Sequence, residues 1–215
     1  MYQYILFDLD GTLTNPEIGI TTCVMHALEK FGIYVKDRKE LHPFIGPPLS
    51  YSFQTFYGLT EEESKQAILT YRERFSTKGL FENEVYPGVR ELLTALKKKG
   101  KKIILATSKP EPFAIKILKY FDLLQYFDFI AGATLDGQRE EKTEVITYAL
   151  SQVAIEDKKQ VIMVGDRNYD ILGAKENEID SLGVLYGFGS RQELEEAGAK
   201  ILVERVEEIL DVIGE

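Results

Sequence analysis

The chain has 215 residues, of which 44% are hydrophobic and 28% charged, and it carries a formal net charge of −9. These values allow one substantial core, or a core with a small inserted domain, and the acidic balance argues against nucleic acid polymers and anionic membranes as partners. A single cysteine, Cys23, permits no internal disulfide, and no apolar run reaches the length of a membrane span, so we expect a cytoplasmic protein.

The first predicted element is a strand in the apolar run Tyr4-Ile5-Leu6, and it ends close to two carboxylates, Asp8 and Asp10. Residues two apart in a strand lie on the same side, so both carboxylates can face one small volume. Gly11 then lets the chain turn sharply at little steric cost. A divalent cation would relieve the repulsion between the carboxylates, after which one could attack as a nucleophile and the other could move protons.

The next segment, 16–83, has a helical pattern. Apolar residues at helical spacing predict a first helix that Gly32 can end, and its apolar positions are Ile20, Val24, Leu28 and Phe31. A capping-box pattern at 60–63 opens a second long helix to about Phe75, and Gly-Pro-Pro at 46–48 opens a shorter one. This block is too long for an ordinary loop, so we interpret it as an inserted cap domain that can exclude water and contact a leaving group.

After Tyr-Pro-Gly at 86–88 the pattern changes to alternating strands and helices. Apolar runs predict strands at 102–107, 127–131, 160–164, 181–186 and 200–203. Helices are expected at 89–99, after Pro110, at 142–152, from the residues after Asp166 to about 177, at 194–198 and at 206–213. This alternation indicates βαβ units and a parallel sheet buried on both faces. We therefore predict an α/β fold with a Rossmann-like parallel sheet, formed by 1–15 plus 84–215, and a small all-helical cap, 16–83, inserted after the first strand.

Polar residues follow three of these predicted strands at the carboxyl ends, where ligands of such sheets bind. They are Asp8 with Asp10, Thr107 with Ser108, and Asp166. Because the chain has one cysteine and two separate histidines, His26 and His42, any metal at this edge must be held by oxygen. Oxygen ligation favours magnesium or calcium over zinc.

Four sequence elements, in one order, resemble the haloacid dehalogenase superfamily over essentially the whole chain. They are Asp8-Leu9-Asp10-Gly11-Thr12, Thr107 at the end of its strand, Lys142, and Val164-Gly165-Asp166-Arg167-Asn168-Tyr169-Asp170. The place of the cap, between the first and second elements, resembles the helical-cap subclass. Two further segments are similar to the phosphoglycolate phosphatase-like branch, in which small bacterial 5′-nucleotidases look similar too: Gly46-Pro47-Pro48-Leu49 and Tyr186-Gly187-Phe188-Gly189.

The resemblance implies a role for each matching residue. Asp8 would be the nucleophile that forms an aspartyl-phosphate, and Asp10 would protonate the leaving oxygen and later activate water. Thr107 would hydrogen-bond a phosphoryl oxygen, and Lys142 would place a positive charge beside Asp8 and the phosphoryl group. The expected substrate-binding set is Gly11, Thr107, Ser108 and Lys142.

Mg²⁺ is the cofactor that the resemblance implies. The expected metal site is formed by Asp8, Asp10 through its backbone carbonyl, Asp166 and Asp170. Asp170 lies one helical turn after Asp166, so it would bind the metal through water or orient Lys142. Arg167 has two interpretations, contact with an anionic substrate or pairing with an acidic side chain, and we favour the second.

We predict a Mg²⁺-dependent phosphomonoesterase for a small phosphorylated metabolite, similar to phosphoglycolate phosphatase or to 5′-nucleotidase. Asp10 argues against dehalogenation, which needs no second acid, and the cap lysines lack the apolar setting that a Schiff-base hydrolase requires: Lys30, Lys36 and Lys39. A sugar phosphate mutase is the alternative enzyme because it uses the same core residues. A non-catalytic binding protein on this scaffold is the alternative of a different class. The expected partner is a small phosphoester, and both a monomer and a homodimer are open.

Overall fold

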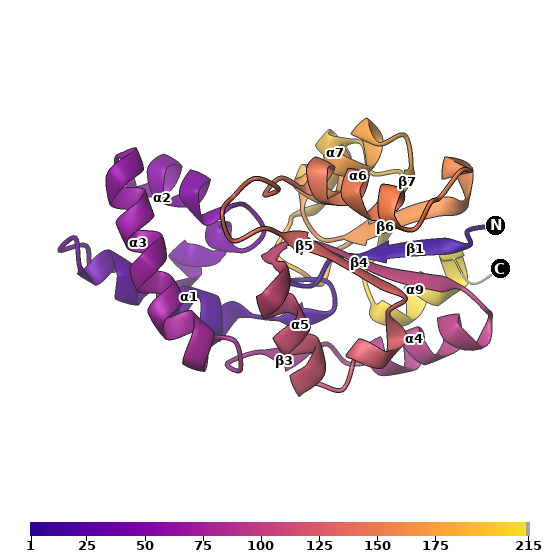
Figure 1. Cartoon of the computed structure of the whole chain (residues 1–215), viewed down its shortest axis with the longest axis horizontal. Coiled ribbons are helices and arrows are strands. Elements are labelled where there is room, and N and C mark those ends of the chain that lie inside the picture. The colour runs from indigo at the N-terminus through magenta and orange to yellow at the C-terminus, as the bar shows by residue number, and fades with distance from the viewer. Residues whose placement is uncertain (214–215) are drawn as a thin grey trace. The chain divides into compact units, whose positions relative to one another are not determined.

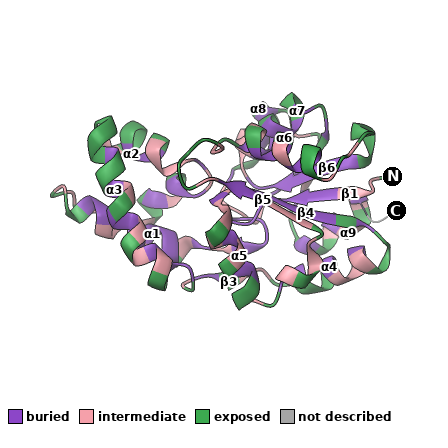
Figure 2. Cartoon of the chain, viewed as in Figure 1, coloured by how far each residue is buried: buried purple, intermediate pink, exposed green. Residues whose placement is uncertain are grey.

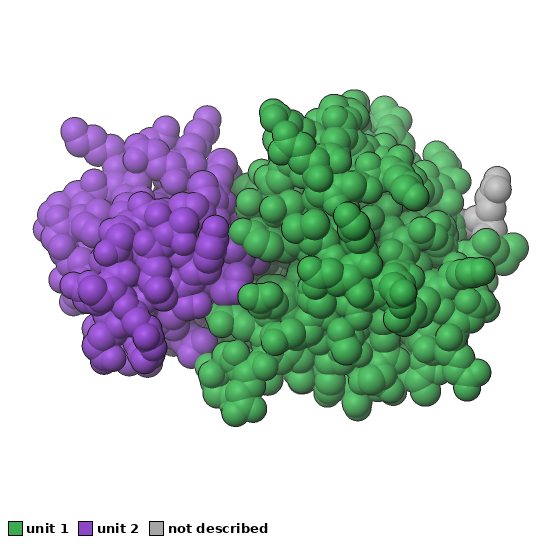
Figure 3. Space-filling view, turned by 90° about the horizontal axis from the view of Figure 1, so that it is seen from above, with its two compact units in different colours: residues 1–15, 85–215 green, residues 16–84 purple. Residues whose placement is uncertain are grey.

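The structure, a computed structural model, describes residues 1–213 and separates into two compact units (Figure 3). Unit 1 contains Met1–Asn15 and the chain from Val85 onward, and unit 2 contains Pro16–Glu84. The chain passes between the units through two short strands, β2 (Thr14–Asn15) and β3 (Glu84–Val85), which pair with each other. The second crossing falls between residues 84 and 85.

Unit 1 is built on a six-stranded sheet in which the neighbouring strands are parallel. In spatial order the strands are β5 (Phe129–Ala133), β4 (Lys102–Pro110), β1 (Tyr4–Phe7), β6 (Val161–Gly165), β7 (Asp180–Val184) and β8 (Ile201–Val203). The chain builds outward from β1 through β4 to β5, then crosses to the other side of β1 and continues through β6, β7 and β8. This is the strand order of Rossmann-type folds, so the predicted Rossmann-like parallel sheet is confirmed.

Helices cover both faces of this sheet (Figure 1). On one face α6 (Lys142–Gln152) and α7 (Asn168–Glu176) pack together, and α8 (Arg191–Ala197) packs against α7. On the other face lie α4 (Val89–Lys98), α5 (Glu111–Tyr120) and α9 (Val206–Ile213). Two 3₁₀ turns, Leu124–Tyr126 and Lys158–Gln160, each precede a strand. The strands are consequently buried from both sides, and every residue of β6 is buried (Figure 2).

Unit 2 is helical and consists of α1 (Glu17–Glu29), α2 (Leu49–Tyr57) and α3 (Glu61–Arg74), with a 3₁₀ helix at Arg38–Phe44 and a π-helical turn at Phe75–Gly79. The capping box before α3 is present: Thr60 Oγ1 accepts the Glu63 N–H at 3.3 Å, and the Glu63 carboxylate accepts the Thr60 N–H at 2.8 Å. Phe44 and Phe53 are buried and pack edge to face, with ring centres 5.1 Å apart. Within residues 1–213, no helix has both the length and the apolar character needed to cross a bilayer.

Strands β1 and β6 end side by side, which brings the first and fourth sequence elements together. Phe7 is in register with Val164, and the Asp8 N–H donates to the Val164 carbonyl at 3.0 Å. Asp8 and Asp166 therefore follow neighbouring strands at the point where the strand order reverses. Ligands of open α/β sheets bind at this point.

Candidate active site

The turn after β1 approaches the Asp166 carboxylate closely because Gly11 has no side chain. Gly11 has a φ of +81°, and a Cβ placed on it would lie 2.1 Å from Oδ2 of Asp166. Any other residue would be strained in its backbone and would collide with that carboxylate. The Gly11 N–H donates to the Thr14 carbonyl at 2.7 Å, and the Thr12 hydroxyl donates to Oδ1 of Asp166 at 3.3 Å. The turn therefore reverses the chain and also holds Asp166.

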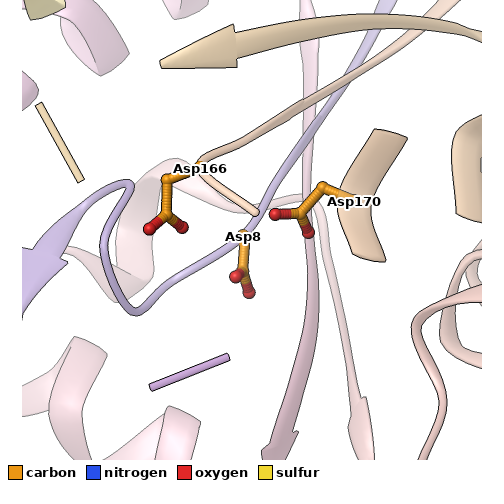
Figure 4. A group of neighbouring side chains, drawn as sticks. All are labelled: Asp8, Asp166 and Asp170. Carbon is orange, nitrogen blue, oxygen red and sulfur yellow. The ribbon is translucent and has the colours of Figure 1, made fainter. Parts of the chain in front are cut away.

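Three carboxylates meet at the carboxyl edge of the sheet (Figure 4). Asp8 follows β1, Asp166 follows β6, and Asp170 belongs to the first turn of α7. Each offers an oxygen atom, and these three oxygens lie within 4.8 Å of one another. Asp8 is 4% exposed and the other two are 0% exposed. A buried set of carboxylate oxygens with this spacing suits a hard divalent cation.

Lys142, the first residue of α6, lies between two of these carboxylates. Its Nζ is 2.8 Å from Oδ1 of Asp8 and 2.8 Å from Oδ1 of Asp170, and it donates to the Ala106 carbonyl at 3.0 Å. Burial alone would lower the pKa of Lys142, but the two carboxylates outweigh burial and raise that pKa above its usual value. Lys142 is therefore a fixed positive charge beside Asp8.

Asp10 is paired with a lysine that the sequence analysis did not single out. Lys109 Nζ lies 2.7 Å from Oδ2 of Asp10, and the Lys109 N–H donates to Thr107 Oγ1 at 3.2 Å. The other carboxylate oxygen of Asp10, Oδ1, is buried and has no hydrogen-bond partner within residues 1–213. Burial raises the pKa of Asp10, and Lys109 partly opposes that rise. A raised pKa suits a carboxyl group that donates a proton near neutral pH.

The charges of the cluster are unbalanced without a cation. Burial raises the pKa of Asp166 well above its usual value, and the neighbouring carboxylates of Asp170 and Asp8 raise it further. Burial also raises the pKa of Asp170, to about 6, although Lys142 opposes this effect. When all groups are ionised, four buried carboxylates face two buried ammonium groups, which leaves a formal charge of −2. Both the oxygen donors and this charge fit a divalent cation.

The loop after β7 packs against Asp166. The Phe188 N–H donates to Oδ2 of Asp166 at 2.8 Å, and the Tyr186 hydroxyl donates to the Thr12 carbonyl at 2.9 Å. A Cβ placed on Gly187 would lie 2.4 Å from the Cβ of Asp166. This loop, which the sequence analysis used only as a resemblance, therefore orients the Asp166 carboxylate and supports the turn after β1.

The residues selected from the sequence fall into two contact groups at this edge of the sheet. The first comprises Asp8, Gly11, Lys142, Asp166 and Asp170. The second comprises Asp10 and Thr107, which are joined through Lys109. Ser108 lies beside Thr107 in the chain and is half-buried, and Arg167 Nε donates to the Glu193 carboxylate at 2.8 Å. Arg167 thus pairs with an acidic side chain.

Sequence reasoning missed Lys109, the Thr12 hydroxyl and the Phe188 N–H. Local patterns gave no signal for Lys109, because a lysine near a strand end is normally solvated, whereas this lysine is buried in an ion pair with Asp10. The hydrogen bonds of Thr12 and Phe188 to Asp166 join residues 154 and 22 positions apart, so local patterns contain no signal for them.

Comparison with known proteins matches the chain to one protein family. Residues 5–184 match the sequence model of haloacid dehalogenase-like hydrolases. A 5′-nucleotidase of Pseudomonas aeruginosa is 46% identical over 193 residues, which is 90% of this chain and 87% of the relative. The tyrosine-protein kinase PtkA of Mycobacterium tuberculosis is 34% identical over 214 residues, which is 99% of this chain and 72% of the relative.

A solved structure agrees with these sequence matches. A protein of Clostridium acetobutylicum, described as a predicted phosphatase, is 47% identical and has a TM-score of 0.97, with 99% of this chain and 98% of the other covered. The family match spans most of the chain, including the elements that carry Asp8, Thr107, Lys142 and Asp166. The chain therefore belongs to the haloacid dehalogenase-like hydrolase family.

Proposed function

We propose that this protein is a Mg²⁺-dependent phosphomonoesterase that hydrolyses a small phosphorylated metabolite through an aspartyl-phosphate at Asp8, with unit 2 as its cap. The observation that carries the proposal is the setting of the Asp8 carboxylate. It is buried, lies 2.8 Å from the Lys142 ammonium, and shares a group of oxygens within 4.8 Å with Asp166 and Asp170. A carboxylate that is fixed between a lysine and a cation site suits attack on a phosphoryl group.

Asp8, Asp166 and the backbone carbonyl of Asp10 would hold the Mg²⁺ ion. Asp170 lies 2.8 Å from Lys142, which favours the role of orienting that lysine over direct ligation of the metal. When bound, the ion supplies positive charge to Asp8 and to the phosphoryl oxygens.

In the first step, an Asp8 carboxylate oxygen attacks phosphorus, and the bond from phosphorus to the leaving oxygen breaks. Asp10 gives its carboxyl proton to the leaving oxygen, so the product alcohol departs neutral. Lys142 balances the charge that gathers on Asp8 and the phosphoryl group, and the Thr107 hydroxyl donates to a phosphoryl oxygen.

In the second step, water attacks the phosphorus atom of the aspartyl-phosphate. Asp10, now a carboxylate, accepts a proton from this water, and the bond between phosphorus and Asp8 breaks. Inorganic phosphate leaves, Asp8 is a carboxylate again, and Asp10 is again protonated for the next turnover.

Nucleoside 5′-monophosphates are the first substrate candidates, because the relative named 5′-nucleotidase is 46% identical over 90% of this chain. Phosphoglycolate is the second substrate candidate, because the loop after β7 resembles that of the phosphoglycolate phosphatase-like branch. The relative named tyrosine-protein kinase supports one further candidate function, phosphoryl transfer to a protein tyrosine. In that reaction a tyrosine hydroxyl would take the place of water as acceptor.

The test is phosphate release from a panel of nucleoside 5′-monophosphates, phosphoglycolate, sugar phosphates, phosphotyrosine and ATP, with Mg²⁺ or with a chelator. Wild type and Asp8→Asn are compared. We expect one ester to be hydrolysed far faster than the rest, by the wild type with Mg²⁺ only. Isomerised sugar phosphate would indicate a mutase, and labelled protein from ATP would indicate a kinase. Full activity of Asp8→Asn would exclude the proposed nucleophile.

A further inference from the structure

The end of β4 is irregular, and this irregularity sets the position of Lys109. Thr107 pairs with Gly132 of β5, but the next paired residue of β4 is Pro110, which faces Ala133. Ser108 and Lys109 are therefore extra residues on β4, as in a β-bulge. Bulges re-aim side chains and are common beside active sites. Lys109 is buried here, at 8% exposure, rather than solvated as a lysine at a strand end normally is.

Two contacts of Lys109 each reach a residue with a proposed role in the reaction. Its Nζ lies 2.7 Å from Oδ2 of Asp10, in a pair whose side chains are 5% and 10% exposed. Its backbone N–H donates to Oγ1 of Thr107 at 3.2 Å. A side-chain substitution at Lys109 removes the first contact and keeps the second, so the two can be separated by experiment.

The two oxygens of the Asp10 carboxyl have different surroundings. Oδ2 is held by the Lys109 ammonium, whereas Oδ1 is buried without a hydrogen-bond partner in the described chain, 1–213. Because an ammonium group can only donate, a proton carried by Asp10 belongs on Oδ1. Lys109 therefore distinguishes the two oxygens of the Asp10 carboxyl group.

We propose that Lys109 is a positioning residue that holds the Asp10 carboxyl with Oδ1 directed toward the leaving oxygen, an inference that rests on the proposed phosphomonoesterase reaction. In the first step the proton on Oδ1 passes to the leaving oxygen as its bond to phosphorus breaks. The resulting Asp10 carboxylate is balanced by Lys109. In the second step a proton of the attacking water returns to Oδ1.

The experiment measures how much the rate depends on the basicity of the leaving group. Aryl phosphates are the probes: 4-nitrophenyl phosphate has a weakly basic leaving group that needs little protonation, and phenyl phosphate has a more basic one. If Lys109 directs Asp10, Lys109→Met loses roughly 10-fold or more in kcat/KM on phenyl phosphate beyond its loss on 4-nitrophenyl phosphate. Lys109→Arg, which keeps the ion pair, recovers most of that difference.

Lys101→Met is the matched control. Lys101 is also buried, at 4% exposure, but its Nζ donates to the Tyr2 carbonyl at the other end of the sheet. This variant should lower the melting temperature and keep the wild-type ratio of the two rates. If Lys109 were only structural, Lys109→Met would likewise lose stability and keep the wild-type ratio of kcat/KM on the two aryl phosphates. That unchanged ratio in a folded Lys109→Met would overturn the inference.

The double variant Asp10→Asn/Lys109→Met covers the case in which Lys109→Met does not fold. It removes both charges of the pair and so leaves no buried carboxylate without its partner. If Lys109 acts through Asp10, the double variant has the same kcat/KM on phenyl phosphate as Asp10→Asn. A kcat/KM below that of Asp10→Asn, by the factor that Lys109→Met loses alone, would overturn the inference. A wild type that hydrolyses neither ester would instead overturn the proposed function, and the inference with it.

Discussion

Lys142 and Asp170 form a buried ion pair, with Nζ 2.8 Å from Oδ1, that joins the first turn of α6 to the first turn of α7. The same ammonium reaches Asp8 at the end of β1. Gly173 lets the two helices approach at this point, since a Cβ there would lie 3.1 Å from Cγ of Lys142. The packing of two helices therefore determines where positive charge stands beside Asp8.

Asp170→Asn tests whether Asp170 orients Lys142 or ligates the metal. The amide keeps the size of the side chain but removes its charge, so Lys142 is held less firmly. We expect kcat at saturating Mg²⁺ to fall by roughly 10- to 100-fold, the usual cost of losing a supporting contact. The Mg²⁺ concentration for half-maximal activity should change little. A large rise in that concentration with normal kcat would show direct ligation instead.

Lys142→Met removes the ammonium group and leaves Asp8 and Asp170 without their buried counter-charge. Removing one partner of a buried ion pair costs about 3–5 kcal/mol, and losing a donor to a developing charge costs about 10²- to 10³-fold in kcat. Urea unfolding and steady-state kinetics measure the two effects. Lys101→Met should be destabilised and keep its kcat, so an equal loss of kcat in both variants would contradict the assigned role.

Gly11→Ala separates backbone strain from collision with Asp166. Gly11 and Gly100 both have positive φ, +81° and +74°, but a Cβ on Gly100 would have no heavy atom within 4 Å. Both substitutions should cost about 1–2 kcal/mol of stability from backbone strain. Only Gly11→Ala should also displace Asp166 and weaken Mg²⁺ binding, measured by calorimetry. Equal Mg²⁺ affinity in the two variants would contradict this placement of Asp166.

Mg²⁺ should stabilise the folded protein more as the pH rises. Burial raises the pKa of Asp166 well above its usual value and that of Asp170 to about 6. The metal-free folded state therefore binds these protons more tightly than the unfolded chain does, and it loses stability as the pH rises from about 4 through the raised values. A bound cation replaces the protons and removes this loss.

Thermal unfolding with Mg²⁺ and with a chelator, from about pH 5 to about pH 8, measures this effect. The Mg²⁺-induced increase in melting temperature should grow with pH and level off above the raised pKa values. An increase that is independent of pH would show that the buried carboxylates do not bind the ion.

The sheet and much of the site could be predicted because their signals are local. Continuous apolar runs before Asp8, Thr107 and Asp166 identify the parallel strands, and the structure places Asp8 and Asp166 directly after β1 and β6. The parallel order then requires that Asp8 and Asp166 come close together, since β1 and β6 are neighbours.

The remaining contacts depend on geometry that local patterns do not contain. Strand β4 continues to Pro110, three residues past the predicted end at Thr107, because the bulge at Ser108 and Lys109 lets pairing with β5 resume. That bulge also turns Lys109 toward Asp10, so neither the strand end nor the ion pair follows from alternation or apolar runs. The position of Phe188 against Asp166 likewise depends on how the loop after β7 folds back.

Trapping the covalent intermediate during a single turnover tests nucleophilic attack by Asp8 most directly. The wild type is mixed with the preferred ester and Mg²⁺, quenched in acid within one turnover, and digested for mass spectrometry. We expect a phosphoryl group on Asp8 that is absent from Asp8→Asn and is lost on further incubation before the quench. A wild type that releases phosphate with no phosphorylated peptide, or with the phosphoryl group on another residue, would contradict nucleophilic attack by Asp8.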